Sequence, residues 1–309
     1  MKLGTILLFL VSFSWSLQGQ KLYVQTFGEK GATPLVFLHG GPGYNAATFE
    51  FSTAQALADK GFFVVVYDRR GEGRSTDEKA KFTFEESLKD LNKICKSLKL
   101  KKVHLLGHSF GGMVAIKFAK KYPKKMNSIT LIGAPLDLQA TFKTIIASSK
   151  EIYTKNEDGS NLAYIQMLEE MDTSLLTYAN YCFLHAMQNG FYSPKRPNEK
   201  TMTIYKNASK NPVFVEYASK MTQNPVKGFW SNEEYTTMNL SQDLQDFKTN
   251  GLPCFGLYGQ EDGLFSPQQV EHIQNIIGTK NVEYLENCSH SVFIDRQDKF
   301  IQSLLNWTK

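Results

Sequence analysis

The sequence has little of what marks several classes of protein. Its 309 residues carry a formal net charge of only +5, from 35 Lys and Arg against 30 Asp and Glu, with no concentrated basic tail. Attraction to a phosphate backbone would therefore be weak and diffuse, and we expect no nucleic-acid partner. Ten prolines and 22 glycines are too few for a collagen-like or disordered chain. The length suffices for one large α/β domain with an enclosed site.

Cysteine is also scarce. The four cysteines lie too far apart for a C-x-x-C redox or zinc pattern; they are Cys95, Cys182, Cys254 and Cys288. We interpret them as buried or free thiols, although an exported chain could oxidise them, and their disulfide state stays open. Cys288 lies two residues before His290, where its thiol either modulates a site at His290 or only packs in the protein interior.

Long hydrophobic runs are missing too. The apolar stretch 6–11 is too short for the roughly 20 residues of a membrane helix, and no later run comes close. It follows Lys2 and precedes a small, polar region, which is the layout of a secretory signal peptide. We predict a signal peptide over residues 1–19 and a periplasmic or extracellular protein, with cleavage after Ser16 or Gly19. A retained anchor is the alternative.

Short apolar, β-branched runs alternate with helix-like stretches along most of the chain. This pattern is typical of a largely parallel sheet buried on both faces, and so of an α/β fold. The expected strands are 22–27, 35–38, 62–67, 103–106, 129–132, 254–258 and 282–285. Between residues 136 and 246 the strand pattern stops and the chain becomes helical and aromatic. We therefore predict a core of residues 20–135 and 247–309 with a helical cap, 136–246, inserted in it.

A G-x-S-x-G motif follows one of these strands. Residues 107–112 read GHSFGG between the expected strand 103–106 and a helix. A sharp turn there lifts the hydroxyl of Ser109 above the sheet edge, and glycine leaves room for the crowded backbone. The motif predicts Ser109 as a nucleophile, with a structural tight turn as the alternative.

A serine hydroxyl needs a base and an orienting carboxylate before it can attack a carbonyl carbon. Asp262 follows the strand 254–258, and His290 follows the strand 282–285, in the chain order that this motif requires. Glu261 is the competing acid, and Asp262 could instead cap a helix. We predict Ser109, Asp262 and His290 as the catalytic residues.

A glycine-rich turn supplies the third element. Residues 39–43 read HGGPG directly after the strand 35–38. A tetrahedral intermediate needs backbone N–H groups aimed at its oxyanion, and glycine lets the backbone approach that closely. We expect Gly41 and Phe110 to be the donors; a plain turn is the alternative.

These motifs together resemble the α/β-hydrolase superfamily over essentially the whole mature chain. The HGGPG turn and the stretch 67–75, YDRRGEGRS, are similar to the proline iminopeptidase family, whose pattern is D-Q-R-G-x-G-x-S. The resemblance implies a peptidase that releases N-terminal residues, especially proline, and a helical cap inserted after the sixth strand. This chain departs from the family at Phe110, where Trp is usual, at Arg69, where Gln is usual, and in its export signal.

An aminopeptidase must pair the free ammonium of its substrate with a negative group. The resemblance implies cap glutamates for this role, and the candidates are Glu169, Glu170, Glu216, Glu233 and Glu234. Each could equally be an exposed surface carboxylate. The cap aromatics could form a pocket wall or the core of the cap; they include Tyr178, Tyr181, Phe183, Phe229 and Trp230.

The sequence thus predicts a secreted serine hydrolase that needs no metal or cofactor. The leading substrate hypothesis is a peptide or amide with a small N-terminal residue such as proline. Hydrolysis of a carboxylic ester, lactone or lipid by the same triad is the second hypothesis, and a non-catalytic binding protein on a hydrolase scaffold is the third. We expect no stable membrane span, and the oligomeric state is open.

Overall fold

A computed structural model describes residues 22–308, and the expected signal peptide lies outside this range. The described chain forms a seven-stranded sheet in the order β1-β3-β2-β4-β5-β6-β7, in which β1 is antiparallel to β3 and every other pair is parallel. The strands are β1 (Val24–Phe27), β2 (Thr33–Leu38), β3 (Phe62–Tyr67), β4 (Val103–His108), β5 (Met126–Ile132), β6 (Cys254–Gly259) and β7 (Val282–Leu285). All seven predicted strands therefore lie in one sheet, as expected for an α/β fold.

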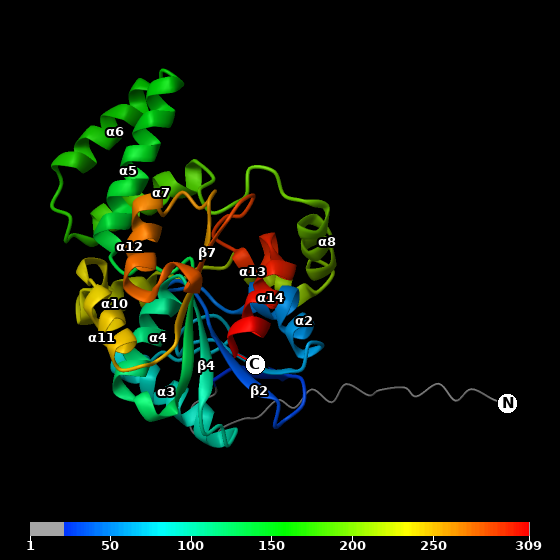
Figure 1. The fold of residues 1–309 in the computed structure, drawn as a ribbon. Coiled ribbons are helices and arrows are strands. Elements are labelled where there is room, and N and C mark those ends of the chain that lie inside the picture. The colour runs from blue at the N-terminus through cyan, green and yellow to red at the C-terminus, as the bar shows by residue number, and fades with distance from the viewer. Residues whose placement is uncertain (1–21, 309) are drawn as a thin grey trace.

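Helices cover both faces of this sheet (Figure 1). One layer contains α3 (Phe84–Ser97), α4 (Phe110–Lys121), α11 (Ser241–Thr249) and α12 (Pro267–Ile277); the other contains α1 (Ala47–Phe49), α2 (Gln55–Ala58), α13 (Val292–Asp295) and α14 (Gln297–Thr308). Alternate side chains of β2 point to opposite faces, so Val36 joins the core under α3 and α4 while Phe37 joins the core under α13 and α14. This double burial explains the near-continuous apolar runs of the central strands.

The predicted helical insertion lies between β5 and β6. It consists of α5 (Leu138–Lys155), α6 (Gly159–Glu170), α7 (Leu176–Gln188), α8 (Glu199–Ala208), α9 (Pro212–Tyr217) and α10 (Gln223–Glu233), and it leads into α11. Short helical turns complete the described chain: η1 (Glu50–Ala54), η2 (Pro123–Lys125), η3 (Tyr235–Thr237) and η4 (Thr279–Asn281). Helices α5 and α6 pack on each other and reach away from the sheet (Figure 1).

Two details of the insertion differ from expectation. It follows the fifth strand of the described chain, because β1 to β5 precede it, whereas the resemblance to the iminopeptidase family implied a cap after the sixth strand. Helix α11 also spans the expected boundary at residue 246, and it packs against α4, α12 and β6 of the core. Its amphipathic sequence resembles the cap helices, so composition alone did not separate it from them.

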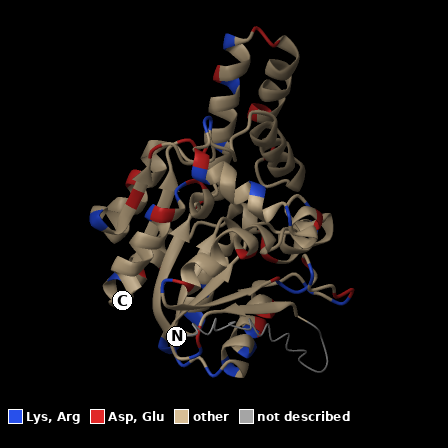
Figure 2. Ribbon diagram, turned by 90° about the vertical axis from the view of Figure 1, so that its right-hand side faces the viewer, with Lys and Arg blue, Asp and Glu red and all other residues tan. Residues whose placement is uncertain are grey.

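Charged residues of both signs are interspersed along the helices in the view of Figure 2, including the paired α5 and α6. Across residues 22–308, no helix is both long enough and apolar enough to cross a bilayer.

Candidate active site

Ser109 occupies a tight turn between β4 and α4. Its φ of 53° is a left-handed backbone conformation that is costly for a residue with a side chain, and its N–H donates to the carbonyl of Ile132 at 2.9 Å. A Cβ atom on Gly111 would lie 2.1 Å from the carbonyl oxygen of Leu38, and one on Gly107 would lie 2.6 Å from the Cα of Gly112. The glycines of the motif therefore let β2, β4 and α4 converge beneath Ser109.

Asp262 and His290 meet at the same edge of the sheet. They follow β6 and β7, and the Nδ1 atom of His290 lies 2.7 Å from Oδ2 of Asp262. Both side chains are buried, and the other carboxylate oxygen of Asp262 accepts from the N–H of Leu264. Because a carboxylate only accepts, Nδ1 carries the ring proton of a neutral His290 and Nε2 is left with a lone pair.

Glu261, the competing acid, points elsewhere. Its Oε2 atom accepts from the backbone N–H of Lys195 at 2.6 Å, on the connection between α7 and α8. Asp262 is thus the carboxylate that contacts His290, and Glu261 ties the insertion to the loop after β6.

A cavity of about 650 Å³ joins the candidate residues, a volume typical of small-molecule sites. Ser109, His290, Gly41 and Phe110 all line it, while Asp262 lies behind His290. Phe110 is the first residue of α4, where a backbone N–H has no acceptor within the helix. The structure therefore brings the predicted nucleophile, base and oxyanion donors to one cavity.

His108 is a neighbour of this cavity whose place the sequence did not reveal. Its ring lies 4.8 Å from that of His290, between centroids, and its Nε2 atom lies 3.1 Å from the carbonyl oxygen of His290. Burial, and then the proximity of His290, lower the pKa of His108 well below its ordinary value. A neutral His108 packs against the loop that carries His290 and adds no positive charge beside it.

Arg69, noted in the sequence only as a departure from the family, holds the glycine-rich turn. Its guanidinium donates to the carbonyl oxygens of His39 at 2.5 Å and Gly40 at 2.6 Å, and to both carboxylate oxygens of Glu72. Glu72 in turn accepts from the N–H of Gly43 at 2.7 Å. Both side chains are buried, so this pair braces residues 39–43 from inside the protein. The fixed fork of a guanidinium suits two carbonyls and a carboxylate at once.

We expect Arg69→Met to lower the free energy of unfolding by about 3–5 kcal/mol, because it leaves the buried carboxylate of Glu72 without its partner. The double variant Arg69→Met, Glu72→Gln should recover much of this loss, since glutamine is uncharged and can still accept from Gly43. Urea denaturation at pH 8 measures both. Equal losses in the single and double variants would show that the buried charge is not the cause.

The structure does not bring the candidate ammonium-binding glutamates to the cavity. Glu169 lies on α6 and pairs with Lys150 of α5 at 2.8 Å, and Glu170 is exposed at the end of α6. Glu233 accepts from the N–H of Phe84 at the start of α3, whereas Glu234 is exposed beyond α10. These carboxylates, like Glu216, are absent from the residues of the described chain that line the cavity. Helical spacing alone could not show which face of each helix turns inward.

The cap aromatics divide between the two roles considered for them. Tyr181 and Phe183 line the cavity, while Tyr178 and Phe229 are buried in the core. Trp230 packs against that core and donates its indole N–H to the carbonyl of Ser174.

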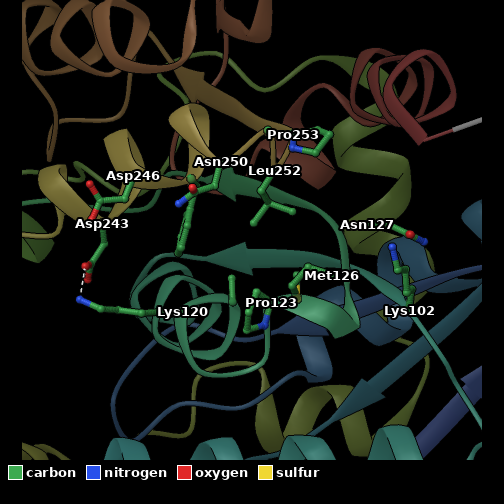
Figure 3. A pocket seen from close by; sticks show the side chains of 13 residues that line it. Lys102, Lys120, Pro123, Met126, Asn127, Asp243, Asp246, Asn250, Leu252 and Pro253 are labelled. Atoms are coloured by element: carbon green, nitrogen blue, oxygen red, sulfur yellow. Dashed lines mark hydrogen bonds and ion pairs between the residues drawn. The ribbon is translucent and has the colours of Figure 1, made fainter.

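A second hollow lies at the opposite ends of the strands (Figure 3). It measures about 470 Å³ and is bordered by the first residue of β5, Met126, and by the ion pair between Lys120 and Asp243. Ligands of open parallel sheets bind outside the carboxyl ends of the strands, where Ser109 lies. We therefore assign the candidate site to the first cavity.

The four cysteines are buried and unpaired with one another, and burial raises the pKa of the Cys288 thiol. Within residues 22–308, no cluster of His, Cys, Asp and Glu side chains has the arrangement of a metal site.

The family model described as alpha/beta hydrolase fold matches residues 33–297, and this chain belongs to that family. Curated proteins that are similar to this chain over most of its length bear the name proline iminopeptidase. The chain is 29% identical over 306 residues to the proline iminopeptidase of Clostridioides difficile (strain 630), covering 94% of this chain and 95% of the relative. The proline iminopeptidase of Saccharolobus solfataricus is 28% identical over 296 residues, covering 92% and 87%.

Solved structures agree on the fold. A proline iminopeptidase-related protein from Thermus thermophilus superposes with a TM-score of 0.67 at 20% identity, covering 96% of this chain and 98% of that one. An esterase from Exiguobacterium antarcticum gives 0.60 at 19% identity, covering 95% and 97%. The fold and the relatives together support hydrolase activity.

Proposed function

We propose that this protein is an exported serine hydrolase that cleaves a carboxylic acyl bond. The hydrogen bond of 2.7 Å between His290 and Asp262, at the cavity that Ser109 lines, carries the proposal. Nε2 of His290 takes the proton of the Ser109 hydroxyl as its oxygen attacks the carbonyl carbon, and Asp262 holds the imidazole. The backbone N–H groups of Gly41 and Phe110 stabilise the oxyanion.

The reaction then proceeds in two halves. The tetrahedral intermediate collapses to an acyl-enzyme on Ser109, and His290 returns its proton to the departing alcohol or amine. Water enters, gives a proton to His290 and attacks the acyl carbon, which releases the carboxylic acid and restores the serine hydroxyl. No step requires a group beyond the protein and water.

The cavity favours a carboxylic ester or lactone as the substrate. Its described lining includes no Asp or Glu side chain that could pair with an ammonium group. A desolvated and unpaired cation costs several kcal/mol, so the part of the substrate that enters should be uncharged.

Release of an N-terminal residue from a peptide is the second candidate. Curated relatives of this chain, 26–29% identical over most of its length, bear the name proline iminopeptidase. In this case the ammonium group of the peptide would remain near the solvent-exposed mouth of the cavity, or the cap helices would move to bring a carboxylate to it.

One comparison separates these candidates. We expect p-nitrophenyl butyrate to be turned over and proline β-naphthylamide not to be, because the ammonium of proline lacks a partner in the cavity. Labelling with a fluorophosphonate, followed by peptide mass analysis, should place the adduct on Ser109. Turnover of the amide alone would establish the aminopeptidase, and the absence of both turnover and adduct would contradict a serine hydrolase.

The proposal that the protein is exported depends on the predicted signal peptide, residues 1–19. The intact mass of the protein recovered from the medium or periplasm tests it. A chain beginning at residue 17 or 20 supports export, and a full-length chain retained in cells contradicts it.

A further inference from the structure

We propose that the cavity is an acyl-chain site, which binds an uncharged aliphatic chain running from Ser109 to an apolar mouth formed by α7 and Met221. The inference rests on the proposed hydrolase and names its substrate class: esters of medium-length fatty acids.

The described lining carries no carboxylate, ammonium or guanidinium group. Among the described residues that line the cavity, none is Asp, Glu, Lys or Arg, and the titratable side chains are His108, His290 and tyrosines. Burial lowers the pKa of His108 well below its ordinary value and raises the pKa of Tyr192 and Tyr235, so these groups are uncharged near neutral pH. A charged substrate segment would find no counter-ion there.

The walls are aliphatic and aromatic, and they come from both parts of the chain. Met113 lies on α4 of the core, Leu138 begins α5 of the insertion, and Phe265 follows β6. Burying a methylene group of the substrate against such a wall improves binding about fourfold. A longer chain should therefore gain affinity until it reaches the mouth.

The mouth leaves apolar side chains in solvent. Leu184 and Met187, one turn apart on α7, line the cavity and are 42% and 55% exposed; Met221, before α10, also lines it and is 54% exposed. Tyr181 extends the same face of α7 by another turn. Exposed apolar residues scattered singly need no explanation, but this set borders the cavity that contains Ser109. A chain bound at Ser109 would cover these side chains as it leaves the cavity.

The flexible methionines at the mouth suit chains of differing length and shape, because the unbranched thioether side chain readily repacks. Met202 on α8 provides a natural control, since it is 52% exposed but does not line the cavity.

Initial rates with p-nitrophenyl acetate, butyrate, hexanoate and octanoate test the inference on the mature chain. We expect kcat/KM to rise at least about tenfold from acetate to octanoate as methylene groups are buried. The 6-aminohexanoate ester should react at least about 100-fold more slowly than the heptanoate ester of matching length, because its ammonium enters unpaired. Faster turnover of the ammonium ester would overturn the inference.

Two matched variants locate the chain. Met187→Glu should lower the ratio of octanoate to acetate turnover about tenfold, because the carboxylate replaces an apolar contact at the mouth. Met202→Glu should leave this ratio unchanged. Equal ratios in the two variants would overturn the acyl-chain site.

The failures of the two proposals are distinguishable. A flat chain-length profile with a fluorophosphonate adduct on Ser109 would remove the acyl-chain site and retain the hydrolase. No turnover and no adduct would remove both. A chain-length effect that required phosphatidylcholine vesicles would assign the mouth to a lipid surface and overturn the inference.

Discussion

Ser109→Ala is expected to lower kcat for p-nitrophenyl butyrate about 10⁶-fold, because the variant has no oxygen to form the acyl-enzyme. The backbone N–H groups of Gly41 and Phe110 remain, so a residual rate about 10³-fold above that in water should persist. Single-turnover kinetics with excess enzyme measures it.

Folding of this variant provides the control. A serine-to-alanine change at a partly exposed position removes one hydroxyl, so the free energy of unfolding should change by less than about 1 kcal/mol. Fluorophosphonate labelling should disappear in the same preparation. A folded Ser109→Ala protein that retains a tenth of the activity would contradict Ser109 as the nucleophile.

The sequence predicted those parts of the fold and site that depend on local pattern. Runs such as 62–67 and 103–106 are apolar because both faces of the sheet are covered, and this burial pattern can be seen without knowledge of the partners. The glycines around Ser109 and the positions of Asp262 and His290 after strands also follow from local chemistry. Parallel topology then brings the carboxyl ends of β4, β6 and β7 to one edge.

What the sequence could not supply depends on contacts across long separations. Arg69 differs from the family pattern, but only the structure shows that it reaches the carbonyls of His39 and Gly40, 30 and 29 residues earlier in the chain. The prediction that glutamates of the insertion reach the cavity failed for the same reason, because the direction of each side chain depends on contacts with distant segments. Glu233 lies close to Tyr235, which lines the cavity, yet its carboxylate turns to the start of α3.

The link between Glu261 and Lys195 shows why adjacent acids have different consequences. The carboxylate of Asp262 contacts His290. The carboxylate of Glu261 accepts from the backbone N–H of Lys195, on the connection between α7 and α8. In the proposed mechanism Asp262 orients His290, whereas Glu261 attaches the insertion to the loop after β6, and matched substitutions separate these two roles.

Asp262→Asn is expected to lower kcat about 10⁴-fold. An asparagine side chain can still accept from the N–H of Leu264, so the loop after β6 should keep its shape. With its oxygen held by Leu264, the asparagine turns its amide N–H₂ group to Nδ1 of His290 and donates to it. The ring proton of His290 then lies on Nε2, so Nε2 has no lone pair with which to take the proton of Ser109.

Glu261→Gln is the matched control, because glutamine keeps an oxygen that accepts from the N–H of Lys195. We expect its kcat to stay within about threefold of the wild type, since uncharging a carboxylate that accepts one backbone hydrogen bond costs about 1 kcal/mol or less. Pre-steady-state release of p-nitrophenol compares the acylation rates of the two variants. A large loss in Glu261→Gln together with a small one in Asp262→Asn would transfer the orienting role to Glu261, which would require the loop after β6 to rearrange during turnover.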